Sequence, residues 1–518
     1  MPPPDRSRAL DHVVVLMFEN RSFDNLLGRL YQPGDVASFE GVLGKDLANP
    51  VPDWAADRSG GGSIAYGVAP NMNTPGEDPG EEYPHVNTQL FGIIDPAANR
   101  SVLADKMVAP FNAPGDIHQR PAMDGFVCDY LSAFTAEIGR QPRYDEYAQI
   151  MTGYAPEQMP VMSAIARGFA CFDHWFCEVP SQTFANRSFF NSGSSSGYVD
   201  NLSPPASFPL RNTAETIFER LDGQGLSWRV YCDPPSHISL TGIIHASRLW
   251  PYFRSRFVST DQFLQDAADG NLPTYSFIEP NLLYGHNDMH PAFAALFKDT
   301  PIDPPSSLLG GEALLAKIYN AIRSASSPEG SNSFNTLLVI TFDEHGGTYD
   351  HVAPPAAPPP HPATAPGQMN FGFDRSGLRV PTIAVSAWIP GQTVVTAQYR
   401  ATSVIATLRK RWQLGAPLAA RDAIAADLAP VLSLQTPRDP ADWPEVVPRP
   451  VPAFTAQVPA PEAALVGLGR AALHACIALA ERDGGSRPSL TQDITISRAD
   501  GIELVLDLAG DAFTHLHG

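Results

Sequence analysis

The sequence predicts an α/β fold in which a large, mostly parallel sheet lies between two layers of helices. Two stretches carry this prediction: His12–Phe18 and Thr336–Phe342 are unbroken runs of apolar and β-branched residues. Such runs are typical of strands that are buried on both faces, as the strands of parallel sheets are. The amphipathic segment 312–323 directly precedes the second run, in the order of a βαβ crossover. Together these features favour a layered α/β domain.

Other segments fit the same plan. Buried or β-branched runs predict further strands, and helical spacing that ends at Gly168 or Gly223 predicts helices between them. The expected strands are 169–176, 226–232, 274–278 and 380–387, and the expected helices are 99–107, 156–168, one opening near Thr183, 214–221, 262–269, 312–323 and 401–412.

The C-terminal part differs in composition from the rest. We expect residues 1–431 to form the catalytic domain, because 432–460 is dense in proline and has no periodic pattern, as a surface linker would be. Residues 461–482 begin with proline and are followed by Gly484 and Gly485, which predicts a helix. The remainder alternates like a β-hairpin, so 461–518 is expected to be a small α+β appendage.

Charge and composition restrict the possible partners. The formal net charge of −20 argues against nucleic acid and against an anionic membrane surface as a delocalised partner. Five scattered cysteines do not form a disulfide framework. The N-terminal residues lack the apolar core of a signal peptide, and no run reaches the roughly 18 apolar residues that span a bilayer. We therefore expect a cytoplasmic protein, unless it leaves the cell by another route; its oligomeric state stays open.

Polar side chains follow both buried runs at the point where each ends. Glu19 and Asn20 follow the first run, and Asp343 and Glu344 follow the second. Because ligands of open α/β sheets bind at the carboxyl ends of the strands, these side chains are expected to meet. Oxygen ligands of this kind suit a hard divalent cation. For Asp343 and Glu344 taken alone, a solvated acidic turn would be the alternative.

Three further polar positions are candidates on weaker grounds. Thr183 stands at an expected helix start, where a hydroxyl is either a nucleophile beside free N–H donors or simply a helix cap. The strand at 274–278 leads into His286, Asp288 and His290. His118 lies in an expected loop, where an isolated histidine is usually a surface residue without a catalytic role.

Four motifs together resemble a known family. They are Glu19-Asn20-Arg21-Ser22-Phe23-Asp24, Thr183-x-x-Asn186-Arg187, Glu279-Pro280-Asn281 with Asn287-Asp288-x-His290-Pro291, and Asp343-Glu344-His345-Gly346-Gly347-x-Tyr349-Asp350-His351-Val352. The resemblance is to the bacterial and plant phosphoesterase family, which includes non-specific phospholipases C and acid phosphatases and has an alkaline-phosphatase-like fold. It extends from about His12 to Trp412.

The resemblance implies a site with one divalent metal ion, which could be Ca, Mg, Mn or Zn. The metal ligands would be Glu19, Asn20, Thr183, Asp343 and Glu344. The catalytic residues would be Thr183, His290, His118 and His351. The substrate-binding residues would be Asn20, Asn186, Arg187, His286 and Asp288. The sequence departs from the family pattern at two places. The family has a second histidine just after the His-Pro pair, which is missing after His290-Pro291, and His286 is a candidate substitute. The segment around His118 is also shorter than the family pattern.

The expected reaction is the hydrolysis of a phosphoric ester through a phosphothreonine at Thr183. A small phosphomonoester is the expected substrate, with cleavage of phospholipid diesters at the head group as the alternative. A sulfatase is a less favoured reading, because neither Cys177 nor Cys232 stands in a Cys-x-Pro-x-Arg setting. A catalytically inactive binding protein is disfavoured because every expected metal ligand is present.

Overall fold

The computed structural model describes residues 5–116, 119–201, 208, 211–234, 239–282, 285–291, 307–361 and 366–452. Its centre is an eight-stranded sheet with the strand order β13-β6-β12-β11-β1-β10-β8-β9. All neighbouring strands run parallel except where β12 pairs with β11 and β6. The strands are β1 (His12–Phe18), β6 (Ala170–Phe172), β8 (Trp228–Cys232), β9 (Phe257–Ser259), β10 (Tyr275–Glu279), β11 (Thr336–Phe342), β12 (Ile383–Val385) and β13 (Thr393–Val395).

Strand β1 lies at the middle of this sheet. It pairs with β11 on one side over its whole length, from His12 opposite Thr336 to Phe18 opposite Phe342, and with β10 on the other side. Val13 to Phe18 are completely buried. Because burial of each such side chain contributes about 1.5–3 kcal/mol, this register is strongly fixed, and so is the place where Glu19 leaves the strand.

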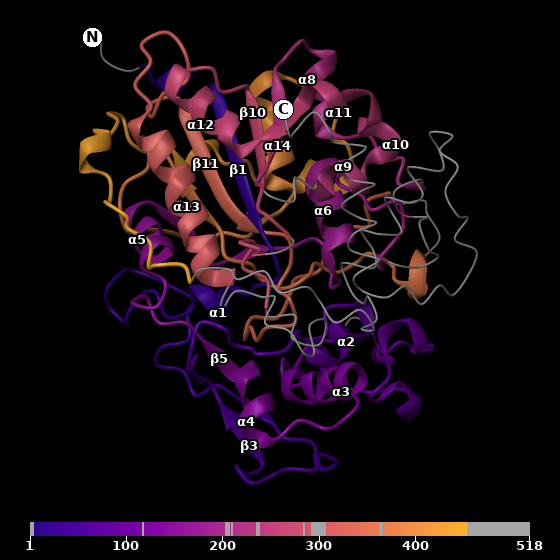
Figure 1. Cartoon of the computed structure of the whole chain (residues 1–518). Coiled ribbons are helices and arrows are strands. Elements are labelled where there is room, and N and C mark those ends of the chain that lie inside the picture. The colour runs from indigo at the N-terminus through magenta and orange to yellow at the C-terminus, as the bar shows by residue number, and fades with distance from the viewer. Residues whose placement is uncertain are drawn as a thin grey trace.

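Helices cover both faces of the sheet (Figure 1). In one layer α13 contacts both α5 and α12, and in the other α6 contacts α8, α9 and α14. The bounds in these layers are α5 (Pro160–Gly168), α6 (Thr183–Ser192), α8 (Ile217–Gly223), α9 (Leu240–Ile244), α10 (Ala246–Leu249), α11 (Phe253–Arg256), α12 (Thr260–Asp269), α13 (Ser307–Ser324), α14 (Ser403–Trp412) and α15 (Ala420–Ile424).

A smaller lobe lies beyond the carboxyl ends of β1 and β11, at the bottom of Figure 1. It has its own apolar cluster, in which Val86 and Leu90 of α2 contact Phe126 and Leu131 of α3. Its elements are α1 (Phe23–Leu26), α2 (Tyr83–Phe91), α3 (Phe126–Ile138), α4 (Tyr144–Tyr147), β2 (Ala48–Pro50), β3 (Ser63–Ala65), β4 (Gly67–Val68) and β5 (Thr152–Gly153). A further short pair joins β7 (Trp175–Phe176) to β14 (Tyr399–Arg400).

The three-layer α/β prediction is confirmed, and the runs 12–18 and 336–342 are strands with the predicted bounds. The helix expected over 99–107 is wrong: Ala97–Asn99 and Ala104–Lys106 are separate 3₁₀ turns, because Ser101 between them has a left-handed backbone with φ 58°. Strand 380–387 is shortened to Ile383–Val385. The appendage expected at 461–518 lies outside the described residues.

The proline-rich segment that follows the domain is held on the sheet by a few contacts. Leu434 and Arg438 donate backbone hydrogen bonds to the carbonyls of Trp388 and Ala387 at 3.0 and 2.8 Å. Trp443 packs edge-on against Phe169, with 5.0 Å between ring centroids. The described part of the segment, 432–452, therefore runs along the domain, and its role as a linker to 461–518 stays a prediction.

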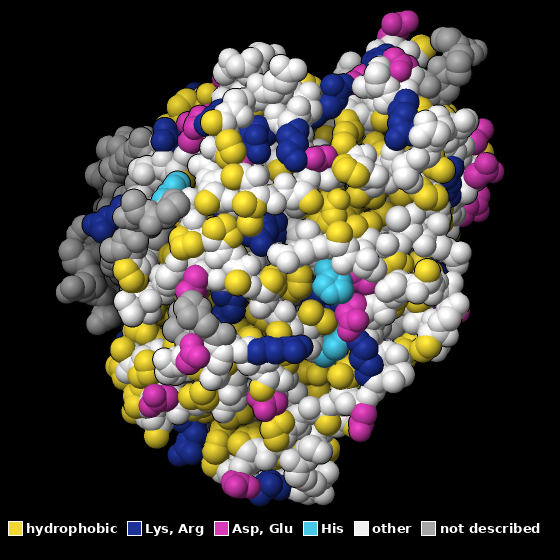
Figure 2. Space-filling model, turned by 180° about the vertical axis from the view of Figure 1, so that it is seen from behind, with side chains coloured by type: hydrophobic (Ala, Val, Ile, Leu, Met, Phe, Trp, Pro, Cys, Tyr) yellow, Lys and Arg dark blue, Asp and Glu magenta, His cyan; other side chains and the backbone are white. Residues whose placement is uncertain are grey.

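On the opposite face of the molecule, acidic and basic side chains are interspersed with apolar ones (Figure 2). Within the described part of the chain, none of the helices is both long enough and apolar enough to cross a bilayer.

Candidate active site

Three neighbouring strands deliver carboxylates to one buried point. Glu19 follows β1, Asp343 follows β11 and Glu279 is the last residue of β10, and all three surround the guanidinium of Arg187. Arg187 Nη2 lies 2.8 Å from Glu19 Oε1, Nε lies 3.1 Å from Asp343 Oδ2, and Nη1 lies 3.4 Å from Glu279 Oε1. The predicted meeting of strand ends is therefore found, with Arg187 at its centre.

Helix α6 brings the candidate nucleophile to the same place. Arg187 stands four residues after Thr183, so the two side chains share one face of the helix. Thr183 is the first helical residue and Gln182 precedes it as the N-cap, so the hydroxyl is not used as a cap. Thr183 is fully buried, and its Oγ1 has no hydrogen-bond partner among the described residues.

Unpaired buried oxygens recur on three of the four other expected metal ligands, whereas both carboxylate oxygens of Asp343 accept hydrogen bonds. Glu19 Oε2, Asn20 Oδ1 and Glu344 Oε1 also lack a hydrogen-bond partner within the described part of the chain. An unsatisfied buried acceptor costs about 1–3 kcal/mol, and more when it is charged. Carboxylate, amide and hydroxyl oxygens are the donor types that a hard divalent cation prefers, so the chemistry of these residues fits such an ion.

The pKa shifts of the buried carboxyl groups also fit a bound cation. Burial, followed by the nearby carboxylates of Asp343 and Asp288, raises the pKa of Glu19 well above its usual range, although Arg187 opposes this. Burial and Asp343 likewise raise the pKa of Glu344 well above normal. A cation placed between these carboxylates would favour their ionised forms.

Asn20 is fixed by both its backbone and its side chain. Its φ of 60° is left-handed, which asparagine tolerates better than most residues. Gly346 packs against it so closely that a Cβ atom there would lie 2.1 Å from the Asn20 carbonyl oxygen. The Asn20 amide nitrogen contacts Glu81 Oε2 and lies 2.7 Å from His290 Nε2.

The histidines after β10 form a connected group with Asp288. Asp288 Oδ1 accepts hydrogen bonds from His286 Nδ1 at 2.7 Å and from the backbone N–H of His290 at 2.9 Å. His290 Nδ1 lies 2.9 Å from the carbonyl of Pro291, and because a carbonyl only accepts, Nδ1 carries the proton. Burial lowers the pKa of His290 to about 4, so the ring is neutral with an accepting Nε2.

Two predicted substrate ligands have structural partners instead. Asn186 Oδ1 accepts from the backbone N–H groups of Glu178 and Val179 at 2.9 and 3.0 Å, and its Nδ2 donates to the carbonyl of Ser181 at 2.6 Å. Asn186 thus shapes the loop that leads into α6. Arg187 holds the three carboxylates of the centre together. Their expected contacts with substrate stay predictions.

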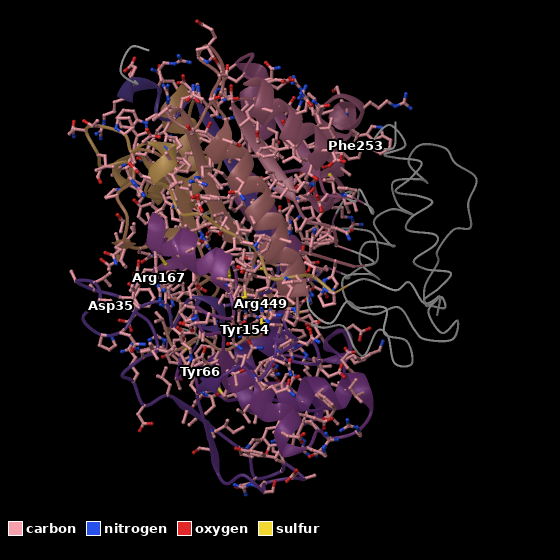
Figure 3. The ribbon with its side chains drawn as sticks, turned by 60° about the vertical axis from the view of Figure 1, so that its left-hand side comes forward. Asp35, Tyr66, Tyr154, Arg167, Phe253 and Arg449 are labelled. Atoms are coloured by element: carbon pink, nitrogen blue, oxygen red, sulfur yellow. The ribbon has the colours of Figure 1, made fainter. Side chains whose placement is uncertain are left out.

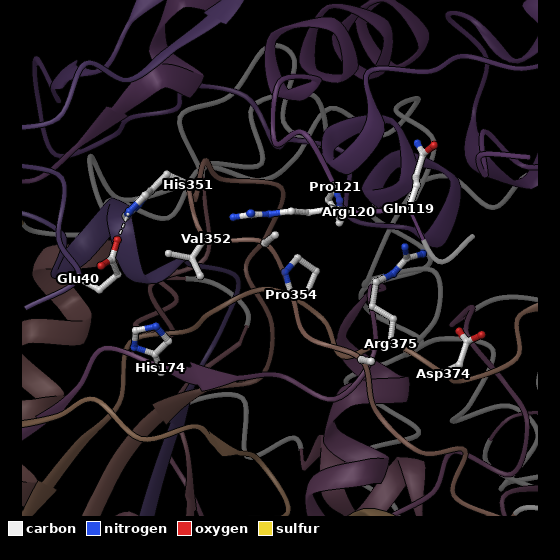
Figure 4. Close-up of a pocket in the computed structure, with 12 residues that line it drawn as sticks. Glu40, Gln119, Arg120, Pro121, His174, His351, Val352, Pro354, Asp374 and Arg375 are labelled. Carbon is white, nitrogen blue, oxygen red and sulfur yellow. Dashed lines mark hydrogen bonds and ion pairs between the residues drawn. The ribbon is translucent and has the colours of Figure 1, made fainter. Parts of the chain in front are cut away.

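His351 belongs to a different cluster. Its Nδ1 lies 2.6 Å from Asp24 Oδ2 and its Nε2 lies 2.9 Å from Glu40 Oε1. It borders a pocket of about 520 Å³ that is also lined by Glu40, Arg120 and Arg375 (Figure 4). These contacts do not connect His351 with the carboxylate centre. His118, the other expected catalytic histidine, lies outside the described residues.

The sequence analysis missed two acidic residues of the site. Asp78, Glu81 and His290 each offer a ligand atom within 4.8 Å of the others. Both carboxylates come from the loop just before α2, where the acidic run Glu77-Asp78-Pro79-Gly80-Glu81-Glu82 at a helix start was the available signal.

A series of buried polar side chains connects Glu344 to helices α2 and α3. His345 Nδ1 lies 3.2 Å from Glu344 Oε2, and His345 Nε2 donates to Gln89 Oε1 at 2.7 Å. Gln89 donates to Asp129 at 2.8 Å, and Asp129 pairs with His85 at 2.7 Å. Although burial alone would lower it, Asp129 raises the pKa of His85 to about 9. Through these contacts, helices α2 and α3 hold His345 beside Glu344, just after the end of β11.

Arg21 connects the first motif to the smaller lobe. Its Nε donates to the carbonyl of Met289 at 2.7 Å, and its Nη1 donates to the carbonyl of Thr74 at 2.9 Å. The hydroxyl of Tyr154, which lies below α5 in Figure 3, donates to the same Thr74 carbonyl at 2.7 Å. The two loops on either side of the centre are therefore held in place by one buried cation.

Curated proteins of similar sequence include phospholipases C. "Non-specific phospholipase C6" of Arabidopsis thaliana is 34% identical over 84% of this chain and 75% of its own length. "Non-specific phospholipase C1" of the same plant is 30% identical over 84% and 73%. "Phospholipase C B" of Mycobacterium tuberculosis is 24% identical over 85% and 81%.

Solved structures show a distant likeness. A phosphonate monoester hydrolase from Silicibacter pomeroyi has a TM-score of 0.29 at 13% identity, over 55% of this chain and 73% of that one. A protein in the alkaline phosphatase superfamily from Vibrio parahaemolyticus has a TM-score of 0.29 at 9% identity, over 52% and 63%. The model of the Phosphoesterase family matches residues 10–415, which contain every motif described above. The chain belongs to the phosphoesterase family.

Proposed function

We propose that this phosphoric ester hydrolase is metal-dependent and uses Thr183 as its nucleophile. The observation that carries the proposal is the buried Thr183 Oγ1, which has no hydrogen-bond partner among the described residues and starts the helix whose Arg187 binds Glu19 and Asp343. A divalent cation held by Glu19, Asn20, Thr183, Asp343 and Glu344 would lower the pKa of the hydroxyl and neutralise charge on the phosphoryl group.

The chain's own residues account for the other parts of the reaction. Thr183 Oγ1 forms a bond to phosphorus as the bond to the leaving oxygen breaks, and the hydroxyl proton passes to one of the surrounding carboxylates. The carboxyl group passes this proton on to the departing alcohol. Water then hydrolyses the phosphate ester on Thr183, which still carries the head group when the substrate is a phospholipid. A catalytic histidine such as His290 can protonate the leaving oxygen or hold a phosphoryl oxygen. Its neutral, accepting ring disfavours the first role, since a general acid must carry a proton at the atom that donates it.

The proposed substrates are phospholipids, cleaved at the phosphodiester on the glycerol side. The names of the related phospholipases C support this choice over the small phosphomonoester that the sequence analysis favoured. Both substrates share a phosphoryl group that would meet the same Thr183, so monoester hydrolysis stays the second prediction. A sulfatase is disfavoured, because the residue at the start of α6 is threonine and not cysteine.

An assay with matched substrates tests the proposal. Release of diacylglycerol from phosphatidylcholine and release of phosphate from an aryl phosphate are measured with wild-type protein, with Thr183→Ala and after removal of metal by a chelator. We expect wild type to act on the lipid, and both treatments to lower turnover at least about a thousandfold. Turnover of Thr183→Ala at the wild-type rate would refute the role of Thr183.

A further inference from the structure

The amide of Asn20 has a fixed orientation, and this orientation decides which of its atoms faces the proposed metal centre. Asn20 is fully buried. Its Nδ2 contacts Glu81 Oε2 and lies 2.7 Å from His290 Nε2. An amide nitrogen has two hydrogens, so two acceptors occupy it completely. The amide oxygen, Oδ1, is left without a hydrogen-bond partner among the described residues.

The chemistry of each partner makes it an acceptor. His290 Nδ1 carries its proton toward the Pro291 carbonyl, so Nε2 accepts. A carboxylate oxygen of Glu81 accepts in either protonation state of the group. If the amide were turned round, Oδ1 would face the two acceptors that Nδ2 now contacts, which is unfavourable.

We propose that Glu81 is a positioning residue that orients the Asn20 amide, so that Oδ1 and not Nδ2 is presented to the divalent cation. The inference rests on the proposed metal centre and deepens it. Glu81 stands at the end of the loop before α2, outside the two strand-end motifs, and is 6% exposed. Residues that orient a metal ligand in this way typically change metal affinity about 10- to 100-fold when they are removed.

A different role for the same residues can be distinguished from this one. Asp78, Glu81 and His290 could themselves surround a second cation, because their ligand atoms lie within 4.8 Å of one another. The Asn20 amide nitrogen, however, already contacts two of these three groups. A positively polarised NH₂ group at that point takes the place of a cation, so we expect one ion per chain.

The test is Mn²⁺ binding by calorimetry, with the number of ions per chain counted after dialysis. Glu81→Ala removes the acceptor and is expected to weaken Mn²⁺ binding at least about tenfold. Glu81→Gln keeps an acceptor oxygen and is expected to stay within about threefold of wild type, which a role as a charged metal ligand would not allow. Glu137→Ala, which removes an exposed carboxylate from α3, is the control and is expected to bind as wild type does.

Three results would overturn the inference while the metal centre stands: unchanged affinity in Glu81→Ala, equal losses in Glu81→Ala and Glu81→Gln, or two Mn²⁺ per wild-type chain falling to one in both variants. Failure of wild type to bind Mn²⁺ would instead overturn the metal centre, and this inference with it. Circular dichroism establishes that each variant is folded. If Glu81→Ala does not fold, Glu81→Leu takes its place with the same expected loss, because it also lacks an acceptor.

Discussion

Arg187 Nη2 lies 2.8 Å from Glu19 Oε1, and neither side chain is exposed to solvent. This contact ties the helix that begins with Thr183 to the central strand of the sheet. Since Arg187 also binds Asp343 and Glu279, one guanidinium compensates three buried carboxylates. The candidate active site is thus assembled around the guanidinium of Arg187.

Arg187→Met should therefore destabilise the fold. The change leaves the carboxylates of Glu19, Asp343 and Glu279 buried and without their partner, and breaking a buried ion pair in this way typically costs about 3–5 kcal/mol. The free energy of unfolding in urea measures the loss. Arg143→Met is the matched control, because Arg143 pairs with Asp145 at the surface with 62% of its side chain exposed. Equal stability of the two variants would contradict this account.

Gln89→Leu should weaken metal binding without touching a proposed ligand. The variant removes the acceptor of His345 Nε2, so the ring beside Glu344 loses the contact that orients it. We expect Mn²⁺ affinity to fall about tenfold, as for other outer contacts of metal ligands. Gln265→Leu on α12 serves as the control, since the amide of Gln265 contacts only Asp269 among the hydrogen bonds found for it. Wild-type affinity in Gln89→Leu would show that the chain from α2 does not support Glu344.

Glu312 should make stability depend on pH. It accepts hydrogen bonds from the N–H groups of Val161 and Met162 at the start of α5, and burial raises its pKa to about 7. A carboxyl whose pKa is raised on folding contributes stability that is present below its unfolded pKa of about 4.5 and is lost as pH rises through 7.

Glu312→Gln removes this titration. Relative to wild type, the variant should gain up to about 3 kcal/mol between pH 4.5 and pH 8, measured as the difference in unfolding free energy at each pH. A difference that stays constant over this range would mean that folding does not raise the pKa of Glu312.

Much of the site was predictable because it lies at the ends of strands whose register is fixed by burial. Glu19 and Asp343 follow such strands directly, so their meeting follows from the parallel pairing of β1 and β11. Glu81 was not predictable in this way, since it reaches Asn20 from a loop whose path depends on the packing of α2 against α3. His351 shares a motif with Asp343 but lies beyond the turn at Gly346 and Gly347, where the chain leaves the centre.

The most direct test of the central claim is to trap the intermediate. Wild-type protein is mixed with metal and phosphatidylcholine or an aryl phosphate, quenched in acid within the first turnover, and digested for mass spectrometry. The account predicts phosphocholine on Thr183 with the lipid and a phosphoryl group on Thr183 with the aryl phosphate, each absent from Thr183→Ala. Continued turnover with no modified residue, or with the phosphoryl group on another side chain, would contradict it.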